Sequence, residues 1–172
     1  MSARVLIVDD SATIRRALEM ILKPEGFELQ LAATGKEALE RAASFDPELI
    51  LLDYVLPDMR GPDVCAALEE IPRTQATPVV LVSAKGTSIR QAYEDARNVV
   101  SYITKPFKPK VVLGVVTHAL AESRRSLPAK TAPLQNIRTT PHRGGLQSVE
   151  IGFRNLLHPL QATPSHAVPY TH

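Results

Sequence analysis

Five polar residues each end or follow a run of aliphatic residues, and they are the candidates for chemistry in this chain: Asp9, Asp10, Asp53, Ser83 and Lys105. Three carboxylates that meet at one point repel one another unless a cation lies between them. Oxygen ligands without thiolate or imidazole favour a hard ion, and Mg²⁺ fits best because it uses few carboxylates together with phosphate oxygens. A carboxylate beside such an ion can attack phosphorus and form an aspartyl phosphate. The hydroxyl and the ammonium are suited to hold the phosphoryl oxygens.

The aliphatic runs indicate the elements that must position these residues. Val5–Val8, Leu49–Leu52 and Val79–Val82 are wholly aliphatic, which is typical of strands buried on both faces of a parallel sheet. Two further strands are predicted over 27–31 and 99–104, and helices are predicted between the strands, over 87–97 in one case and over 109–122 after the last. Strand and helix alternate five times, which predicts an α/β doubly wound, five-stranded parallel sheet with helices on both faces.

In such a sheet the carboxyl ends of the strands meet along one edge, where ligands bind in a crevice. Taken alone, Asp53 has a second interpretation, because Asp is a common turn residue and Asp53 precedes the turn that leads to Pro57. Taken together, the five candidates at four strand ends favour one shared site over separate structural explanations.

The motifs that carry these residues resemble the receiver domain of bacterial two-component response regulators, over residues 3–121. The resemblance rests on Asp9-Asp10, Leu52-Asp53, Pro57, Gly61, Ser83 and the run Tyr102-Ile103-Thr104-Lys105-Pro106-Phe107. It implies the flavodoxin-like strand order 2-1-3-4-5, which the sequence patterns alone do not give.

The resemblance also implies a role for each acidic residue. Asp53 would be the phosphoacceptor, which receives phosphate from a histidine of a sensor kinase or a phosphotransfer protein. Asp10 would be the direct magnesium ligand, Asp9 would act through water, and the backbone carbonyl of Val55 would be the third protein ligand. Mg²⁺ is therefore the expected cofactor.

The same resemblance implies a switch. Lys105 would contact the phosphoryl group, and the Lys105-Pro106 bond would be cis. Ser83 would be the hydroxyl that moves toward the phosphoryl group, and Tyr102 would be the aromatic residue that turns inward after it. Their movement would alter the protein-binding face made by the fourth helix, the fifth strand and the fifth helix.

Two positions depart from fast-resetting relatives, which place a carboxamide or carboxylate there to orient the attacking water. Val55 lies two residues after Asp53, and Lys85 lies two residues after Ser83. Neither side chain can accept a proton, so slow intrinsic dephosphorylation is expected. Val99-Val100-Ser101 replace the acidic residues that DNA-binding relatives usually carry before the switch aromatic, which argues against their mode of dimerisation.

Composition divides the chain into an expected receiver domain at 1–122 and a basic tail at 123–172. The net charge is +2, and residues 122–172 contain six Lys or Arg but only two Asp or Glu. The tail also has six prolines, so we expect it to be mostly disordered, with one possible short amphipathic helix at 146–158. No dense basic stripe predicts nucleic-acid binding, and no apolar run predicts a signal peptide or a membrane span. The single cysteine, Cys65, is consistent with a reduced, cytoplasmic protein.

The sequence therefore predicts a phosphorylation-dependent signalling receiver without a DNA-binding or enzymatic output domain. It would catalyse only its own phosphorylation and dephosphorylation, and would not otherwise be an enzyme. One alternative is a pseudo-receiver, a docking module that is never phosphorylated. Another is an aspartyl-phosphate phosphohydrolase, although such enzymes normally place a second Asp where Val55 stands. Flavin binding is disfavoured because three carboxylates would repel the flavin phosphate.

Overall fold

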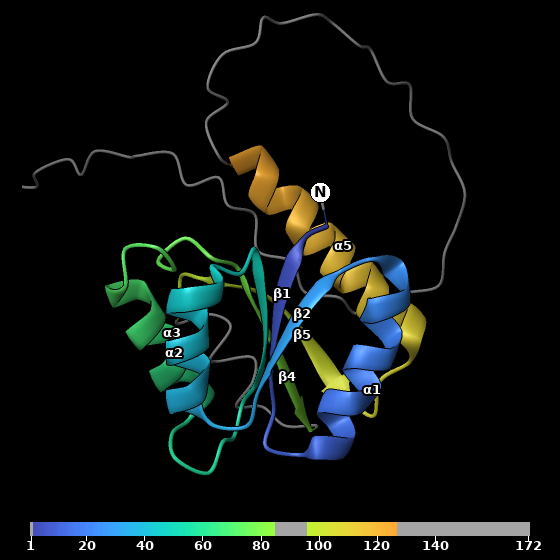
Figure 1. Cartoon of the computed structure of the whole chain (residues 1–172), viewed down its shortest axis with the longest axis horizontal. Helices are drawn as coiled ribbons and strands as arrows, with labels where there is room; N and C mark the ends of the chain where they lie inside the picture. The colour runs from blue at the N-terminus through green and yellow to red at the C-terminus, as the bar shows by residue number, and fades with distance from the viewer. Residues whose placement is uncertain (1, 85–95, 127–172) are drawn as a thin grey trace, which may run out of the picture.

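Five parallel strands form a single sheet in the computed structural model, which describes residues 2–84 and 96–126. The strand order is β2-β1-β3-β4-β5, which confirms the order implied by the family resemblance. Figure 1 shows the sheet at the centre of the molecule. The strands are β1 (Arg4–Val8), β2 (Glu28–Ala32), β3 (Leu49–Asp53), β4 (Val79–Ala84) and β5 (Val99–Lys105).

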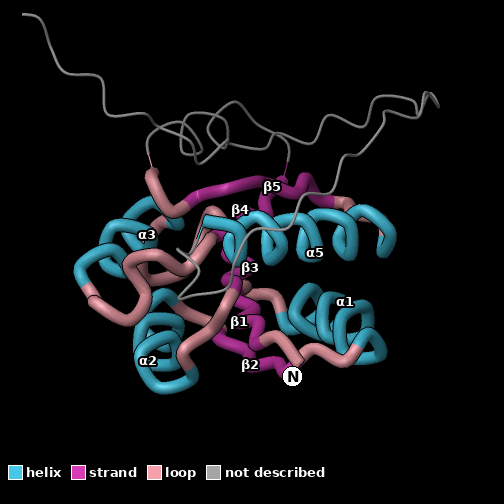
Figure 2. Tube along the Cα trace, turned by 90° about the horizontal axis from the view of Figure 1, so that it is seen from above, coloured by secondary structure: helices cyan, strands magenta, loops and turns pink. Residues whose placement is uncertain are grey.

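Helices cover both faces of the sheet, which makes a three-layer molecule. Seen from above in Figure 2, α1 and α5 lie on one side of the strands and α2 and α3 lie on the other. This arrangement confirms the predicted α/β class. The helices span α1 (Ala12–Leu22), α2 (Gly35–Phe45), α3 (Gly61–Glu70) and α5 (Pro109–Ser126), with a short 3₁₀ helix (Lys23–Glu25) after α1.

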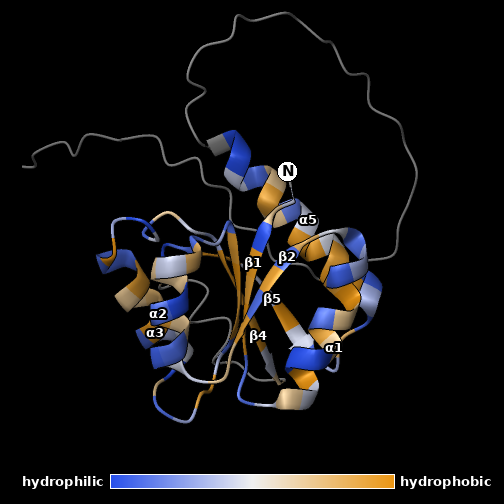
Figure 3. Cartoon of the chain, viewed as in Figure 1, coloured by the Kyte–Doolittle hydropathy of each residue, from blue (hydrophilic) through white to orange (hydrophobic). Residues whose placement is uncertain are grey.

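Alternate side chains of each central strand enter two separate apolar clusters. Leu49 and Leu51 of β3 pack with the side chains of α1 and α5, whereas Ile50 and Leu52 pack with those of α2 and α3. Every residue of β3 is buried, and Figure 3 shows the apolar colouring of the central strands between the helices. The sheet is therefore fixed from both faces, and its carboxyl edge is a rigid platform.

Local signals in the sequence explain where the first two helices begin and where the 3₁₀ helix after α1 ends. The Ser11 side chain accepts a hydrogen bond from the Ile14 amide at 3.4 Å, and the Thr34 side chain accepts one from the Glu37 amide at 3.1 Å. These are N-caps, which satisfy amides that lack partners inside the helix. The 3₁₀ helix that continues α1 ends at Gly26, whose φ of +84° favours glycine.

The last helix differs from the prediction in length. We expected it to end at Glu122, but it continues to Ser126. In this additional turn, Arg124 forms an exposed ion pair with Glu48 at 3.1 Å, just before the amino end of β3. The predicted face of this helix is confirmed, since its apolar residues are all buried: Val112, Val115, Val116, Ala119 and Leu120.

Several predicted elements lie largely outside the described residues. Most of the helix expected over 87–97 falls there, and Arg97 itself lies in the turn before β5. The rest of the expected tail, including the possible helix at 146–158, also lies outside them. Within residues 2–84 and 96–126, no helix combines the length and the apolar character that crossing a bilayer requires.

Candidate functional site

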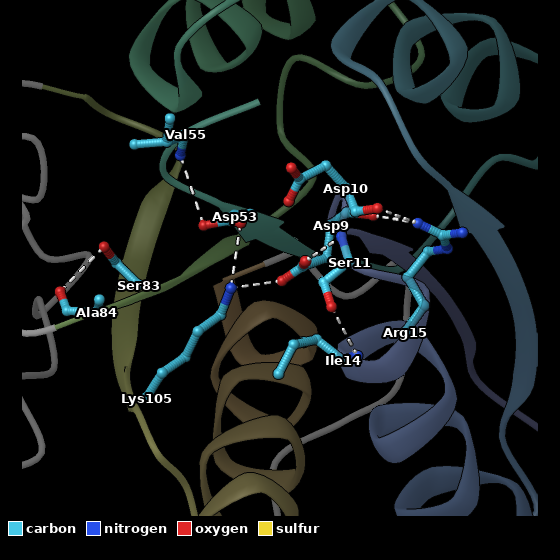
Figure 4. A network of polar contacts seen from close by, with 10 residues as sticks. All are labelled: Asp9, Asp10, Ser11, Ile14, Arg15, Asp53, Val55, Ser83, Ala84 and Lys105. Carbon is cyan, nitrogen blue, oxygen red and sulfur yellow. Dashed lines mark hydrogen bonds and ion pairs between the residues drawn. The ribbon is translucent and has the colours of Figure 1, made fainter. Parts of the chain in front are cut away.

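A lysine and two buried carboxylates form the centre of a polar cluster at the carboxyl edge of the sheet. Asp9 follows β1, Asp53 ends β3 and Lys105 ends β5. The Lys105 ammonium donates to Asp9 Oδ2 at 2.6 Å and to Asp53 Oδ2 at 3.1 Å. Figure 4 shows the long Lys105 side chain reaching between the two carboxylates. The three strands thus bring together residues that are up to 96 positions apart in the sequence.

Burial sets the electrostatics of this cluster. Asp9 is 1% exposed and Asp53 is 7% exposed. Burial raises the pKa of Asp53, the hydrogen bond from Lys105 lowers it, and the negative charge of Asp9 raises it again, so that the net shift is upward. Burial alone would lower the pKa of Lys105, but its hydrogen bonds to the two carboxylates raise it overall. The ammonium therefore stays charged and offsets part of the repulsion between the acids.

Asp10 joins the two buried acids to complete an all-oxygen donor set. One carboxylate oxygen each from Asp9, Asp10 and Asp53 lies within 4.8 Å of the other two. Such a group fits a hard divalent cation, which needs oxygen ligands and compensates the charge of converging carboxylates. The exposed position of Asp10 leaves the group open to solvent on one side, as a site that exchanges ligands requires.

Val55 lies in the loop that follows β3, beside the candidate phosphoacceptor. Its backbone amide donates to Asp53 Oδ1 at 3.4 Å, and its side chain is 62% exposed. The loop is held by a bridge between Val55 and Arg60. The backbone of Val55 is thus close to the acidic group, whereas its hydrocarbon side chain faces solvent.

The two predicted switch residues, Ser83 and Tyr102, lie on β4 and β5, next to this cluster. Ser83 is near the end of β4, and its hydroxyl donates to the carbonyl oxygen of Ala84 at 3.1 Å, not to Asp53 (Figure 4). Tyr102 of β5 is half-buried and packs against the apolar cluster beneath α2 and α3. The Lys105-Pro106 peptide bond is cis.

Arg15 is a site residue that sequence reasoning missed. Its Nη1 donates to the carbonyl oxygens of Asp9 at 2.6 Å and of Asp10 at 3.0 Å. It lies in the first turns of α1, where an arginine is ordinary, and the adjacent Arg16 is just as plausible in the sequence. Only the fold distinguishes the two arginines, because Arg15 points back to the acidic loop and Arg16 pairs with Glu19 on the surface.

Asp58 was missed as well, although it lies in the turn after Asp53. Its two carboxylate oxygens accept from the amides of Gly35 at 2.8 Å and Lys36 at 2.9 Å. These hydrogen bonds lower the pKa of Asp58 and attach the loop after β3 to the first turn of α2. An acid in a turn is a recognisable capping residue, but the sequence does not indicate that it caps a helix formed more than twenty residues earlier.

Comparison with known proteins identifies this arrangement. The sequence profile described as the response regulator receiver domain matches residues 5–117. The chain is similar to the transcriptional regulatory protein ResD of Bacillus subtilis, at 34% identity over 140 residues that cover 81% of this chain and 57% of ResD. It is also similar to the transcriptional regulatory protein SrrA of Staphylococcus aureus, at 36% identity over 133 residues that cover 77% of this chain and 54% of SrrA.

Solved structures lead to the same family. A receiver domain protein (CheY-like) from Methanospirillum hungatei aligns with a TM-score of 0.67 and 28% identity, covering 73% of this chain and 98% of that one. The chemotaxis response regulator CheY4 of Vibrio cholerae aligns with a TM-score of 0.65 and 28% identity, covering 69% of this chain and 99% of CheY4. The chain spans little more than half the length of ResD and SrrA. By the profile match across most of its length, the chain belongs to the response regulator receiver domain family of two-component systems.

Proposed function

We propose that Asp53 accepts a phosphoryl group from a phosphohistidine of a sensor kinase or phosphotransfer protein. A carboxylate oxygen of Asp53 forms a new bond to phosphorus while the bond between phosphorus and the histidine nitrogen breaks. The imidazole leaves with the electron pair of that bond, and it leaves as a neutral group because its other ring nitrogen already carries a proton. The observation that carries the proposal is the geometry of Asp53, buried at a strand end, within 3.1 Å of Lys105 and within 4.8 Å of two further carboxylates.

The chain's own residues supply alignment and charge for this transfer. Asp10, Asp53, Asp9 through water and the Val55 carbonyl would hold Mg²⁺, which when bound neutralises the charge of phosphoryl oxygens. Lys105 is positioned to hold a phosphoryl oxygen beside Asp53, since its ammonium is already within hydrogen-bond distance of that carboxylate. Phosphoryl transfer needs mainly such positioning and charge neutralisation, so no further catalytic group is required.

Phosphorylation would act on a partner through a second surface. Ser83 would turn from the Ala84 carbonyl, to which it now donates, toward the phosphoryl group. Tyr102 would then change its position in the face that includes β5 and α5, to which residues 87–97 are also expected to contribute. The proposed output is therefore a phosphorylation-dependent binding face for a downstream protein. We propose that this domain does not contact nucleic acid directly.

The lifetime of the phosphorylated state should be long. The exposed Val55 side chain next to Asp53 has no polar atom that could orient a water molecule. Lys85, the second position of this kind, lies outside the described residues. We expect Val55→Asn combined with Lys85→Glu to shorten the phosphoryl lifetime in a fluorescence or radiolabel assay. If the double substitution left the phosphoryl lifetime unchanged, residues 55 and 85 would not be the reason that the lifetime is long.

Intact-mass spectrometry after incubation with acetyl phosphate and Mg²⁺ tests the central proposal. The wild-type chain should gain one phosphoryl group, and Asp53→Asn should gain none. Asp46→Asn is a matched control, because Asp46 lies just before the opposite end of β3, far from the cluster, in a left-handed conformation that asparagine tolerates. It should be phosphorylated like the wild type.

Magnesium-dependent beryllofluoride binding, measured by calorimetry, separates the alternatives. A receiver should bind beryllofluoride only when Mg²⁺ is present and only with Asp53 intact. Absence of both the phosphoryl adduct and beryllofluoride binding in the wild type would favour a pseudo-receiver, whose surfaces dock without phosphorylation.

A further inference from the structure

Arg15 connects α1 to the loop that carries the acidic pair. One guanidinium nitrogen, Nη1, donates to two successive carbonyl oxygens, those of Asp9 and Asp10, at 2.6 and 3.0 Å. Figure 4 shows the guanidinium beside this loop, with both contacts drawn. Hydrogen bonds from a charged donor are stronger than neutral ones. The two contacts fix successive peptide planes, and with them the directions in which the two acidic side chains leave the backbone.

The two acids depend on this contact to different degrees. The Asp9 carboxylate has its own anchors, because it accepts from the Ser11 amide at 2.9 Å and from Lys105 at 2.6 Å. Within the described residues, the Asp10 carboxylate takes part in no hydrogen bond or ion pair. Among the described residues, only the backbone of Asp10 therefore restrains the direction in which its side chain leaves, and the hydrogen bond from Arg15 restrains that backbone.

We propose that Arg15 is a positioning residue for the cation site: it holds the backbone of the Asp9–Asp10 loop so that the Asp10 carboxylate faces the cation together with Asp53. This inference rests on the proposed function, because it assumes that the acidic group binds Mg²⁺. Residues behind metal ligands typically contribute 10-fold to 100-fold to metal affinity by orienting those ligands.

Simple electrostatics makes the opposite prediction, which gives the inference a sharp test. If Arg15 acted only through its charge, removing it would lower the positive potential near the site and strengthen Mg²⁺ binding. If Arg15 positions Asp10, removing it weakens Mg²⁺ binding. The two explanations therefore differ in the sign of the change.

Arg16 offers a matched control in the next position of the same helix. It is well exposed, at 69% of its side chain, and it pairs with Glu19 at 2.8 Å on the surface. Arg16→Gln changes the net charge by the same amount as Arg15→Gln does, without touching the acidic loop. A difference between these two variants therefore reports the contact and not the charge.

The experiment is a calorimetric Mg²⁺ titration of the full chain as wild type, Arg15→Gln and Arg16→Gln. We expect Arg15→Gln to weaken Mg²⁺ binding by about 10-fold to 100-fold, and Arg16→Gln to stay within about twofold of the wild type. Arg15→Lys keeps the charge but not the guanidinium geometry, so its affinity should fall between those of the wild type and Arg15→Gln. This third variant also provides the test if Arg15→Gln fails to fold.

Phosphorylation by acetyl phosphate gives a second measurement. Arg15→Gln should be phosphorylated slowly at low Mg²⁺ and should approach the wild-type rate at saturating Mg²⁺, because the defect lies in holding the cation. If the wild type binds no Mg²⁺, the proposed function fails and the inference fails with it. If the wild type binds Mg²⁺ while Arg15→Gln binds as tightly as Arg16→Gln, or more tightly, the inference alone is overturned.

Discussion

Replacing Asp53 with asparagine should stabilise the protein when no divalent cation is present. Asp53 is 7% exposed, and an oxygen of its carboxylate lies within 4.8 Å of one from Asp9. Burial and the charge of Asp9 both oppose ionisation of Asp53, and the bonds from Lys105 compensate only in part, so that its pKa is raised. Asparagine has nearly the same shape and no charge. The substitution therefore removes a repulsion that the fold otherwise has to tolerate.

The magnitude follows from the geometry. Two unit charges no more than 4.8 Å apart repel by at least about 3.5 kcal/mol at an effective dielectric constant of about 20. At the same dielectric constant, the attraction between Asp53 and the Lys105 ammonium at 3.1 Å is about 5 kcal/mol, which asparagine forfeits apart from a neutral hydrogen bond worth about 1 kcal/mol. The sign is therefore set by burial of the carboxylate, the largest cause of its raised pKa, which costs several kcal/mol that asparagine avoids. A net stabilisation of about 1–2 kcal/mol remains. This corresponds to a rise of roughly 0.5–1 M in the urea midpoint.

The pH dependence has a definite sign. A raised pKa in the folded state means that stability is fully present below the ordinary carboxylate pKa and is lost as the pH rises through the folded value. The advantage of Asp53→Asn should therefore be complete at neutral pH and should shrink as the pH falls toward about 4. Saturating Mg²⁺ should reverse the order, because the wild type gains binding energy that the variant largely lacks.

Urea unfolding in EDTA, followed by circular dichroism between pH 4.5 and 8, measures the difference. Asp10→Asn is the matched control, because Asp10 belongs to the same acidic group but is exposed and should change the midpoint less. An Asp53→Asn variant that is less stable than the wild type at pH 7 would refute the reasoning. It would mean that the hydrogen bond from Lys105 outweighs both the repulsion and the cost of burial.

Three other substitutions or reagents test the same structure. Lys105→Met should destabilise the metal-free protein by about 2–3 kcal/mol in urea unfolding, because it leaves two buried acids unpaired. The raised pKa of Lys105 means that this stabilising contribution persists up to the ordinary lysine pKa, near 10.4, and disappears only above the higher folded value. Cys65 is buried, which raises the pKa of its thiol to about 12, so a thiol reagent at pH 8 should label the unfolded chain rapidly and the native chain only as it opens. Ser101→Ala should raise the free energy of unfolding, measured by urea unfolding, by about 1 kcal/mol, since the buried Ser101 hydroxyl has no hydrogen-bond partner within the described residues; a loss of stability would indicate an internal water.

The sequence predicts well those features that depend on one strand or one helix. The unbroken aliphatic run before Asp53 indicates a strand covered on both faces, and all five residues of β3 are buried. The spacing of Val112, Val115 and Val116 indicates one apolar face of α5, and all three are fully buried. Parallel strands then place their polar ends at one edge, so the cluster of Asp9, Asp10, Asp53 and Lys105 follows from topology.

Contacts between loops and distant elements lie beyond such reasoning. The ion pair of Arg124 with Glu48, in the last turn of α5, joins residues 76 positions apart. Asp58 was missed because it caps α2 from a loop that follows β3. Neither contact has a periodicity or a spacing that a single sequence could reveal.

Two of the missed contacts, those of Arg15 and Asp58, share a physical role, which is to restrain loops at the carboxyl edge. Strand register fixes the backbone positions of Asp9 and Asp53 at the edge of the sheet, but a loop can still turn a side chain away from the site. Arg15 restrains the loop after β1 through two backbone carbonyls, and Asp58 restrains the loop after β3 through two backbone amides of α2. Topology thus selects the residues of the site, while side-chain contacts with the backbone determine their precise directions. Substituting Arg15 or Asp58 should accordingly leave the sheet intact and change the geometry of the acidic group.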